Sequence, residues 1–294
     1  MHHIPLVLQY IQEQVQELTS CVGTDCRFIP VGGGSINHAY QLLINGNFRY
    51  FIKLNSEKNY PQLFTTEKNS LEVLGTAKVI RVPRVVAVTA VEGYQVLILE
   101  WIEQGLKTTV FWKSFGEQLA LLHRTDSNTF GLDIDNYMGA LPQTNTKDAD
   151  WCIFFTQQRL VPQIRMARDA QRLGKKEVDH FERLFLRLPE IFPPEPPALL
   201  HGDLWSGNFL CDEHSQPVLV DPATYYGHRS MDLAMTTLFG GFDNVFYESY
   251  QYHFPLPANY CRQWEVCNLY PLLVHLNLFG ESYLPDILHT IQHY

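Results

Sequence analysis

The sequence predicts an α+β fold of two lobes, a small N-terminal lobe with an antiparallel sheet and a larger, mostly helical C-terminal lobe. Short apolar runs joined by turn residues fill most of the first 100 residues, whereas apolar residues at helical spacing dominate the rest of the chain. A stretch rich in acid and glycine, Glu100 to Gly105, separates the two regions. We therefore expect lobes over residues 1–101 and 102–294.

Composition narrows the class of protein. Of the 294 residues, 46% are apolar and 18% charged, which suits a globular protein and argues against disorder. The net charge of −9 speaks against a nucleic-acid partner, which would need a basic surface. The six cysteines form no Cys-x-x-Cys pair, and we find neither a signal peptide nor an apolar run of membrane length. We expect a cytoplasmic protein with reduced thiols and no membrane partner.

The N-terminal lobe is expected to contain two helices and five strands. Apolar residues at helical spacing from Ile4 to Leu18 predict an opening amphipathic helix. Asn45-Gly46-Asn47 is a hairpin signal between two strands. The strands are expected over 27–31, 39–44, 48–54, 83–88 and 94–100, and the second helix over 61–75.

The C-terminal lobe shows mainly helical periodicity. Residues 126–150 are interpreted as an irregular loop, and the five prolines between Pro189 and Pro197 as a stiff connector. The segment from Tyr225 to Met235 leads into a helix. Further helices are expected over 108–123, 151–168, 175–188, 243–252, 260–276 and 280–292.

The most informative stretch is His201-Gly202-Asp203-Leu204-Trp205-Ser206-Gly207-Asn208, followed by an apolar strand and Asp221. Phosphoryl transfer from ATP needs one carboxylate to take the proton of the acceptor hydroxyl. It also needs an amide oxygen and a second carboxylate to hold Mg²⁺ on the phosphates. This order of residues is the catalytic-loop signature of kinases, so the predicted two-lobed fold is protein-kinase-like. The alternative, polar turns between strands, leaves unexplained why all three functional residues adjoin apolar strands.

The departures from protein kinases indicate a small-molecule acceptor. Gly202 stands where protein kinases have the arginine that reads a phosphorylated activation loop. Asp221-Pro222-Ala223 replaces Asp-Phe-Gly, and Pro222 restricts the backbone of Asp221, which disfavours a flipping switch.

Two features of the N-terminal lobe fit phosphate binding. The glycine run Gly32-Gly33-Gly34-Ser35-Ile36-Asn37 can bring backbone N–H groups close to an anion. Lys53 lies on a strand whose neighbouring side chains face the opposite way, so it either contacts phosphates or is an exposed strand lysine. Its expected partner is Glu67, which shares a helix face with Phe64 and Leu71, and Glu72 is the fallback.

Trp205 and Asp232 each allow two interpretations, and His201 is interpreted as a structural support of the catalytic loop. Trp205 either stacks on the apolar face of a sugar or packs under the loop. Asp232 either accepts hydrogen bonds from the catalytic loop, together with His201 as a structural support, or is an acid favoured by the helix dipole.

Taken together, these motifs resemble the fructosamine kinase (ketosamine-3-kinase) family, within the wider aminoglycoside phosphotransferase and choline kinase group. Family-specific segments add to the match and extend it over nearly the whole chain: Tyr226-Gly227-His228-Arg229, Asp232-Leu233-Ala234-Met235, Leu238-Phe239-Gly240-Gly241-Phe242 and Tyr270-Pro271-Leu272-Leu273-Val274-His275.

The resemblance implies ATP- and Mg²⁺-dependent phosphorylation of the sugar 3-hydroxyl in small-molecule or protein-bound ketosamines, the adducts of reducing sugars with amines. The phosphorylated adduct is unstable, so the amine is freed. In this scheme Asp203 is the base, Asn208 and Asp221 hold Mg²⁺, and Lys53 and Glu67 place the phosphates. Glu100, Trp101 and Ile102 would hold adenine through the backbone. The alternatives are an aminoglycoside- or choline-type kinase and a nucleotide-binding pseudokinase.

Overall fold

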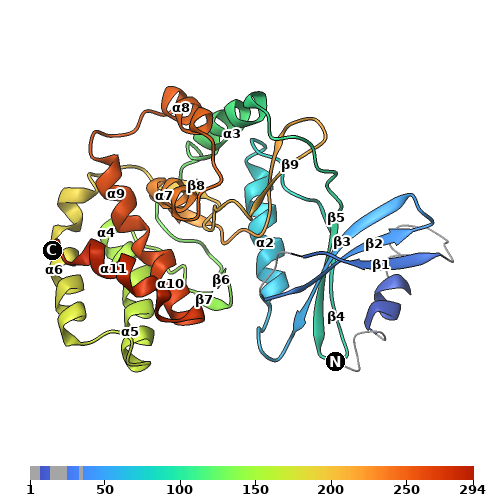
Figure 1. Cartoon of the computed structure of the whole chain (residues 1–294), viewed down its shortest axis with the longest axis horizontal. Coiled ribbons are helices and arrows are strands. Elements are labelled where there is room, and N and C mark those ends of the chain that lie inside the picture. Colours follow the sequence, from blue (N-terminus) through green and yellow to red (C-terminus); the bar gives the residue numbers. More distant parts are fainter. Residues whose placement is uncertain (1–6, 14–24, 33–35) are drawn as a thin grey trace.

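The computed structural model of the chain describes residues 7–13, 25–32 and 36–294 (Figure 1). One part is a five-stranded antiparallel sheet in the order β1-β2-β3-β5-β4, and the other is mostly helical. The strands are β1 (Cys26–Pro30), β2 (His38–Ile44), β3 (Phe48–Ser56), β4 (Val85–Val91) and β5 (Tyr94–Glu100). The predicted two-lobed fold is confirmed, whereas its boundary at residues 101 and 102 stays a prediction.

Tight turns set the register of the sheet. Asn45 and Gly46 both have positive φ, 52° and 72°, between β2 and β3, and Glu92 and Gly93 do the same between β4 and β5. Two consecutive left-handed residues give a turn whose twist matches the flanking strands. In the resulting register Lys53 of β3 lies opposite Leu97 of β5.

The two faces of the sheet are covered by different elements. Residues 7–13 are helical, and Val7 and Ile11 pack with Ile52, Leu54 and Ile98 on one face. Helix α2 (Leu63–Thr76) packs on the other face through Leu63, Phe64 and Leu71, against Leu97 and Leu99. Because side chains alternate along a strand, Lys53 points to the α2 face. Figure 1 shows α2 between the sheet and the helical part.

The helical part is built around two apolar clusters. Helices α3 and α8 approach closely because Gly116 has no side chain, since a Cβ there would lie 2.3 Å from the Phe246 carbonyl oxygen. The helices are α3 (Thr109–Leu122), α4 (Trp151–Phe154), α5 (Val161–Asp169), α6 (Lys175–Ile191), α7 (Ser230–Leu238), α8 (Asn244–His253), α9 (Tyr260–Cys267), α10 (Leu269–Phe279) and α11 (Leu284–Ile291), with a π-helical segment at Phe155–Leu160 and a 3₁₀ turn at Glu281–Tyr283.

Short strand pairs within the helical part carry the motif residues. They are β8 (Ala198–Leu200) with β11 (Tyr225–Gly227), β9 (Phe209–Cys211) with β10 (Pro217–Leu219), and the hairpin of β6 (Asn136–Met138) with β7 (Leu141–Gln143). The catalytic loop joins β8 to β9, and Asp221 lies between β10 and β11.

Several predicted elements differ from the structure. Residues 126–150 are not wholly irregular, because they contain the β6–β7 hairpin. The helix expected over 151–168 is interrupted by the π-helical segment, and that over 260–276 breaks at Asn268. Helix α6 continues through Pro189, so the connector is shorter than expected, and Tyr225 begins a strand before α7. No described helix is both long and apolar enough to cross a bilayer.

Candidate active site

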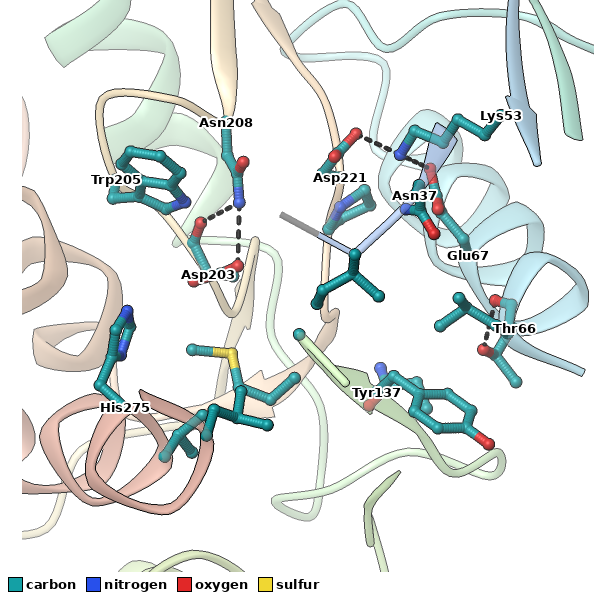
Figure 2. A pocket seen from close by; sticks show the side chains of 18 of the residues that line it. Asn37, Lys53, Thr66, Glu67, Tyr137, Asp203, Trp205, Asn208, Asp221 and His275 are labelled. Carbon is teal, nitrogen blue, oxygen red and sulfur yellow. Dashed lines mark hydrogen bonds and ion pairs between the residues drawn. The ribbon is translucent and has the colours of Figure 1, made fainter. Parts of the chain in front are cut away.

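The catalytic loop is held by hydrogen bonds within itself. The Asn208 amide nitrogen donates to the Asp203 carboxylate and to the Asp203 carbonyl oxygen, each at 2.9 Å. Figure 2 shows the two side chains facing each other at the edge of a pocket. Because the Asn208 nitrogen is engaged with Asp203, the amide oxygen is the atom left to contact a cation.

Asp232, at the start of α7, supports this loop through hydrogen bonds to its backbone. Its carboxylate accepts hydrogen bonds from the backbone N–H groups of His201 at 2.8 Å and Gly202 at 2.9 Å. His123 Nε2 lies 3.2 Å from the same carboxylate. Burial alone would raise the pKa of Asp232, but these hydrogen bonds and the neighbouring histidines hold it below its usual value. Asp232 therefore carries its charge while it orders the loop.

His201 and Gly202 shape the same turn. His201 is fully buried, which lowers its pKa; its Nδ1 accepts the Asp203 N–H at 3.2 Å and its Nε2 donates to the Val220 carbonyl oxygen at 2.9 Å. Gly202 has a φ of 87°, and a Cβ there would lie 2.0 Å from the Ala223 carbonyl oxygen. A side chain at position 202 is thus excluded by both backbone strain and contact.

Lys53, Glu67 and Asp221 meet where the two parts of the fold face each other. Lys53 Nζ lies 2.7 Å from Glu67 Oε1 and 2.5 Å from Asp221 Oδ1, although Asp221 is 168 residues away in sequence (Figure 2). Burial opposes the charge of Lys53, but the two carboxylates raise its pKa above the usual value. Glu72 instead pairs with Lys68 at 2.8 Å on the surface, so Glu67 is the partner of Lys53.

Asp203 lies in surroundings that favour its protonated form. Burial raises its pKa to about 7, and the negative charges of Asp221 and Asp232 add to this, whereas the hydrogen bond from Asn208 opposes it. A general base is most effective when its pKa lies near the working pH.

The pocket around these groups has a second wall that the sequence did not reveal. The β6–β7 hairpin contributes Tyr137 and Met138, and α10 contributes His275 and Phe279. His275 Nδ1 donates to the Pro271 carbonyl oxygen at 2.7 Å, burial lowers its pKa, and its ring faces the pocket in Figure 2. The hairpin lay in a stretch interpreted as an irregular loop, and the helical periodicity over 260–276 does not mark which side chains line a pocket.

Trp205 packs on the catalytic loop, as one of its two interpretations expected, and stacking on a sugar stays a prediction. It is half-buried at the rim of the pocket, and its ring packs edge-on against Phe239 with centroids 6.0 Å apart. It also covers Gly207, where a Cβ would lie 2.3 Å from the indole. The indole therefore packs on the loop and presents apolar surface to the pocket.

The predicted nucleotide-binding residues differ in whether they line this pocket. Asn37 does line the pocket and accepts a hydrogen bond from Asn55 at 2.7 Å. Glu100, Trp101 and Ile102 do not line it: the Glu100 carboxylate pairs with Arg81 at 3.2 Å, and Trp101 packs against Phe51. Gly33, Gly34 and Ser35 lie outside the described residues.

The donor set fits a magnesium ion shared with phosphates. Within the described ranges, no group of three histidine, cysteine or acidic side chains is arranged to hold a metal alone. Asn208 and Asp221 offer an amide oxygen and a carboxylate, the hard oxygen ligands that Mg²⁺ prefers. Mg²⁺ usually takes only one or two carboxylates from a protein and completes its shell with phosphate oxygens and water.

Comparison with known proteins gives consistent matches over the whole chain. The family model for fructosamine kinase matches residues 7–294. A protein from Lactiplantibacillus plantarum named "Probable ketoamine kinase" is 40% identical over 269 residues, covering 90% of this chain and 93% of the relative. The "Protein-ribulosamine 3-kinase, chloroplastic" of Arabidopsis thaliana is 34% identical over 273 residues, covering 90% of this chain and 81% of the relative.

Solved structures agree with these matches. The crystal structure of a "putative fructosamine-3-kinase" from Thermobifida fusca has a TM-score of 0.84 at 32% identity, covering 95% of this chain and 96% of the other. An aminoglycoside-3'-phosphotransferase of type VIII has a TM-score of 0.53 at 18% identity, covering 91% of this chain and 99% of the other, and this likeness concerns the fold alone. As its motifs predicted, the chain belongs to the fructosamine kinase family.

Proposed function

We propose that this chain transfers the γ-phosphoryl group of ATP to the sugar 3-hydroxyl of a ketosamine. The observation that carries the proposal is the 2.5 Å contact of Lys53 with Asp221, beside a pocket that also contains Asp203 and Asn208. The names of the relatives, ketoamine kinase and protein-ribulosamine 3-kinase, support a ketosamine as the acceptor.

Each residue has a role that follows from its contacts. Asp203 accepts the proton of the attacking hydroxyl, and the hydrogen bond from Asn208 holds its carboxylate toward the pocket. Lys53, fixed by Glu67, binds phosphate oxygens. Asn208 and Asp221 would hold Mg²⁺, which neutralises phosphate charge when bound. The glycine run ending at Asn37 would contact the phosphates, and backbone groups of residues 100–102, which lie outside the pocket, would bind adenine.

The pocket wall that contains Trp205 and His275 fits a sugar acceptor. Trp205 offers an indole face for the apolar side of a sugar ring, and His275 offers an imidazole beside it. Phosphorylation at the 3-hydroxyl destabilises the adduct and frees the amine, which would make the enzyme a deglycation enzyme of the cytoplasm, acting on free or protein-bound adducts.

A substrate panel tests the proposal. Purified protein is given Mg·ATP with ribulosamine, fructosamine or an aminoglycoside, and both ADP release and the phosphorylated product are measured. We expect turnover on the ketosamines and little on the aminoglycoside. Preference for the aminoglycoside would assign the chain to the other kinase class, and no turnover on any acceptor would favour a pseudokinase. Asp203→Asn serves as the matched inactive control.

A further inference from the structure

Asp221 holds a backbone conformation that needs outside support. Its φ is 55°, in the left-handed region, although the residue before a proline prefers an extended conformation. Aspartate tolerates this region better than most residues, yet such a conformation persists only where the surrounding structure fixes it. The segment directly after Asp221, Pro222 to Thr224, must therefore be firmly anchored.

Two buried amides anchor that segment. Gln143 Nε2 donates to the Ala223 carbonyl oxygen at 3.1 Å, and Asn136 Nδ2 donates to the Thr224 carbonyl oxygen at 2.8 Å. Asn136 and Gln143 lie directly opposite each other in the β6–β7 hairpin, and they are 4% and 2% exposed. We call them the amide pair.

The amide pair is itself fixed in orientation. Gln143 Nε2 also donates to Asn136 Oδ1 at 2.7 Å, and the Tyr270 hydroxyl donates to Gln143 Oε1 at 2.8 Å. Asn145 Nδ2 adds a hydrogen bond to Asn136 Oδ1 at 3.2 Å. Rotation of either amide would break several of these bonds, so the two donors aimed at residues 223 and 224 cannot turn away.

Arg159 is linked to the amide pair through Asn145. It forms an ion pair with no carboxylate in the described part of the chain. It is fully buried, its Nη2 donates to Asn145 Oδ1 at 2.7 Å, and its guanidinium carbon lies 4.0 Å from the centre of the Tyr225 ring. Its Nη1 and Nη2 donate only to neutral acceptors among the described residues. Burying a charge without an opposite charge beside it is costly. Arg159 also lies in the π-helical segment Phe155–Leu160, and such segments occur frequently at functional sites. The network therefore runs from a buried cation to the backbone that follows Asp221.

We propose that Asn136 and Gln143 are positioning residues for Asp221. By holding the carbonyl groups of Ala223 and Thr224, the amide pair keeps Asp221 in its left-handed conformation and aims its carboxylate at the metal site. This inference rests on the proposed role of Asp221 in holding Mg²⁺.

The test compares two buried glutamines. Gln143→Met removes the donor to the Ala223 carbonyl oxygen and the bond to Asn136 with little change in shape. Gln263→Met removes equally buried hydrogen bonds, to the Ile191 carbonyl oxygen and from the Ser230 hydroxyl, and neither bond involves residues 221–224. The affinity for the non-hydrolysable analogue AMP-PNP is measured with Mg²⁺ and with EDTA. We expect Gln143→Met to lose about tenfold or more of the Mg²⁺-dependent gain in affinity. Gln263→Met should keep that gain.

Two further variants separate the possible failures. Asp221→Asn must abolish most of the Mg²⁺-dependent gain, and if it does not, the proposed metal role of Asp221 is wrong. If Asp221→Asn loses the gain and Gln143→Met keeps it, or if both glutamine variants lose it equally, the positioning role is wrong. Should Gln143→Met fail to fold, Tyr270→Phe removes only the hydroxyl that orients Gln143, and it should shift the gain in the same direction by a smaller factor. An unchanged gain in Tyr270→Phe would then overturn the inference.

Discussion

Asp203 illustrates how a single side chain takes its chemical character from its neighbours. Partial burial and the charge of Asp221 raise its pKa to about 7, and Asn208 fixes its position by two hydrogen bonds. An asparagine at position 203 could still accept the hydrogen bond from Asn208, but its amide could not take a proton from the substrate. The residue therefore allows a substitution that separates geometry from chemistry.

We expect Asp203→Asn to fold normally and to lose about 10²–10⁴-fold in kcat, the usual contribution of a positioned base. Steady-state ADP release with a saturating ketosamine checks this. Asp133→Asn, at an aspartate whose side chain is 82% exposed, is the matched control and should retain full turnover. Turnover of Asp203→Asn near that of the wild type would remove Asp203 from its role.

The pH dependence of the wild type should report the same group. Because the base must be unprotonated, kcat/KM should rise with pH through about 7 and then level off.

The free energy of unfolding should instead fall as the pH rises. The folded state holds the proton up to about pH 7 and the unfolded state releases it near 3.8, so the free energy of unfolding falls between these values.

Asp203→Asn removes this linked loss of stability. Its melting temperature should therefore exceed that of the wild type by more at pH 8 than at pH 5, as measured by thermal denaturation at both values. An equal difference at the two pH values would show that Asp203 titrates normally.

The sequence was informative about residues at fixed spacing and uninformative about residues brought in by the fold. Asp203, Asn208 and Asp221 adjoin apolar strands in a recognisable order, so they could be singled out as candidates. Asn136 and Gln143 are buried amides in strands of three residues each, within a stretch rich in turn formers. No periodicity marks such residues, because their burial depends on backbone carbonyl groups some 80 positions away.

At the scale of the element, α2 carries two glutamates with opposite fates. Glu67 faces the sheet and holds the buried Lys53, whereas Glu72 forms an exposed i,i+4 pair with Lys68. The apolar stripe of the helix predicted this difference, because Glu67 lies beside Phe64 and Leu71.

We expect Glu67→Gln to lower kcat/KM for ATP by about tenfold or more, equivalent to about 1.4 kcal/mol, because Lys53 loses the charge that orients it. Glu72→Gln on the same helix should change it by less than about twofold, since exposed pairs contribute little. Initial rates at varied ATP and fixed ketosamine give both values. Equal losses in the two variants would contradict the assignment of Glu67.

Elements whose apolar pattern is long and regular were predicted well, and irregular ones were not. The strands of the sheet and α3 follow the expected ranges closely, because alternation and helical spacing are clear there. The break at Asn268 and the π-helical segment lie within stretches that keep helical apolar spacing. Periodicity alone therefore predicts one continuous helix in each place.

At the scale of the whole molecule, the contact of Lys53 with Asp221 joins the sheet to the helical part. The β6–β7 hairpin adds a second link, because the Tyr137 hydroxyl donates to the Pro61 carbonyl oxygen just before α2 at 2.9 Å. A ligand that binds between these parts should stabilise both together.

We expect Mg²⁺ with AMP-PNP at 100 times its Kd to raise the free energy of unfolding by about 2.7 kcal/mol. The melting temperature should rise by several degrees, measured by differential scanning calorimetry with Mg²⁺ and again with EDTA. In Asp221→Asn the rise should be much smaller with Mg²⁺ and similar to the wild type with EDTA. A rise independent of Mg²⁺ in the wild type would argue against a metal held at Asp221.

The overall architecture could be predicted because the motifs and the coarse pattern agree with each other. Strand alternation before residue 100, helical spacing after it and a kinase-type loop point to one fold. What the pattern could not supply was the distance between Lys53 and Asp221, since that depends on how the two parts of the chain are docked.

The π-helical segment Phe155–Leu160 makes the chain unusually tolerant of a change in length at this point. A π turn contains one residue more than an α turn, so deletion of one residue here would allow an ordinary helix to run on into α5. Because the wider turn absorbs the extra residue, the side chains of α5 would keep their direction, and Ile164 and Ala167 would stay in the core. A single-residue deletion should therefore be tolerated within this segment before it is tolerated within α5, where it would turn every later side chain by about 100° around the axis.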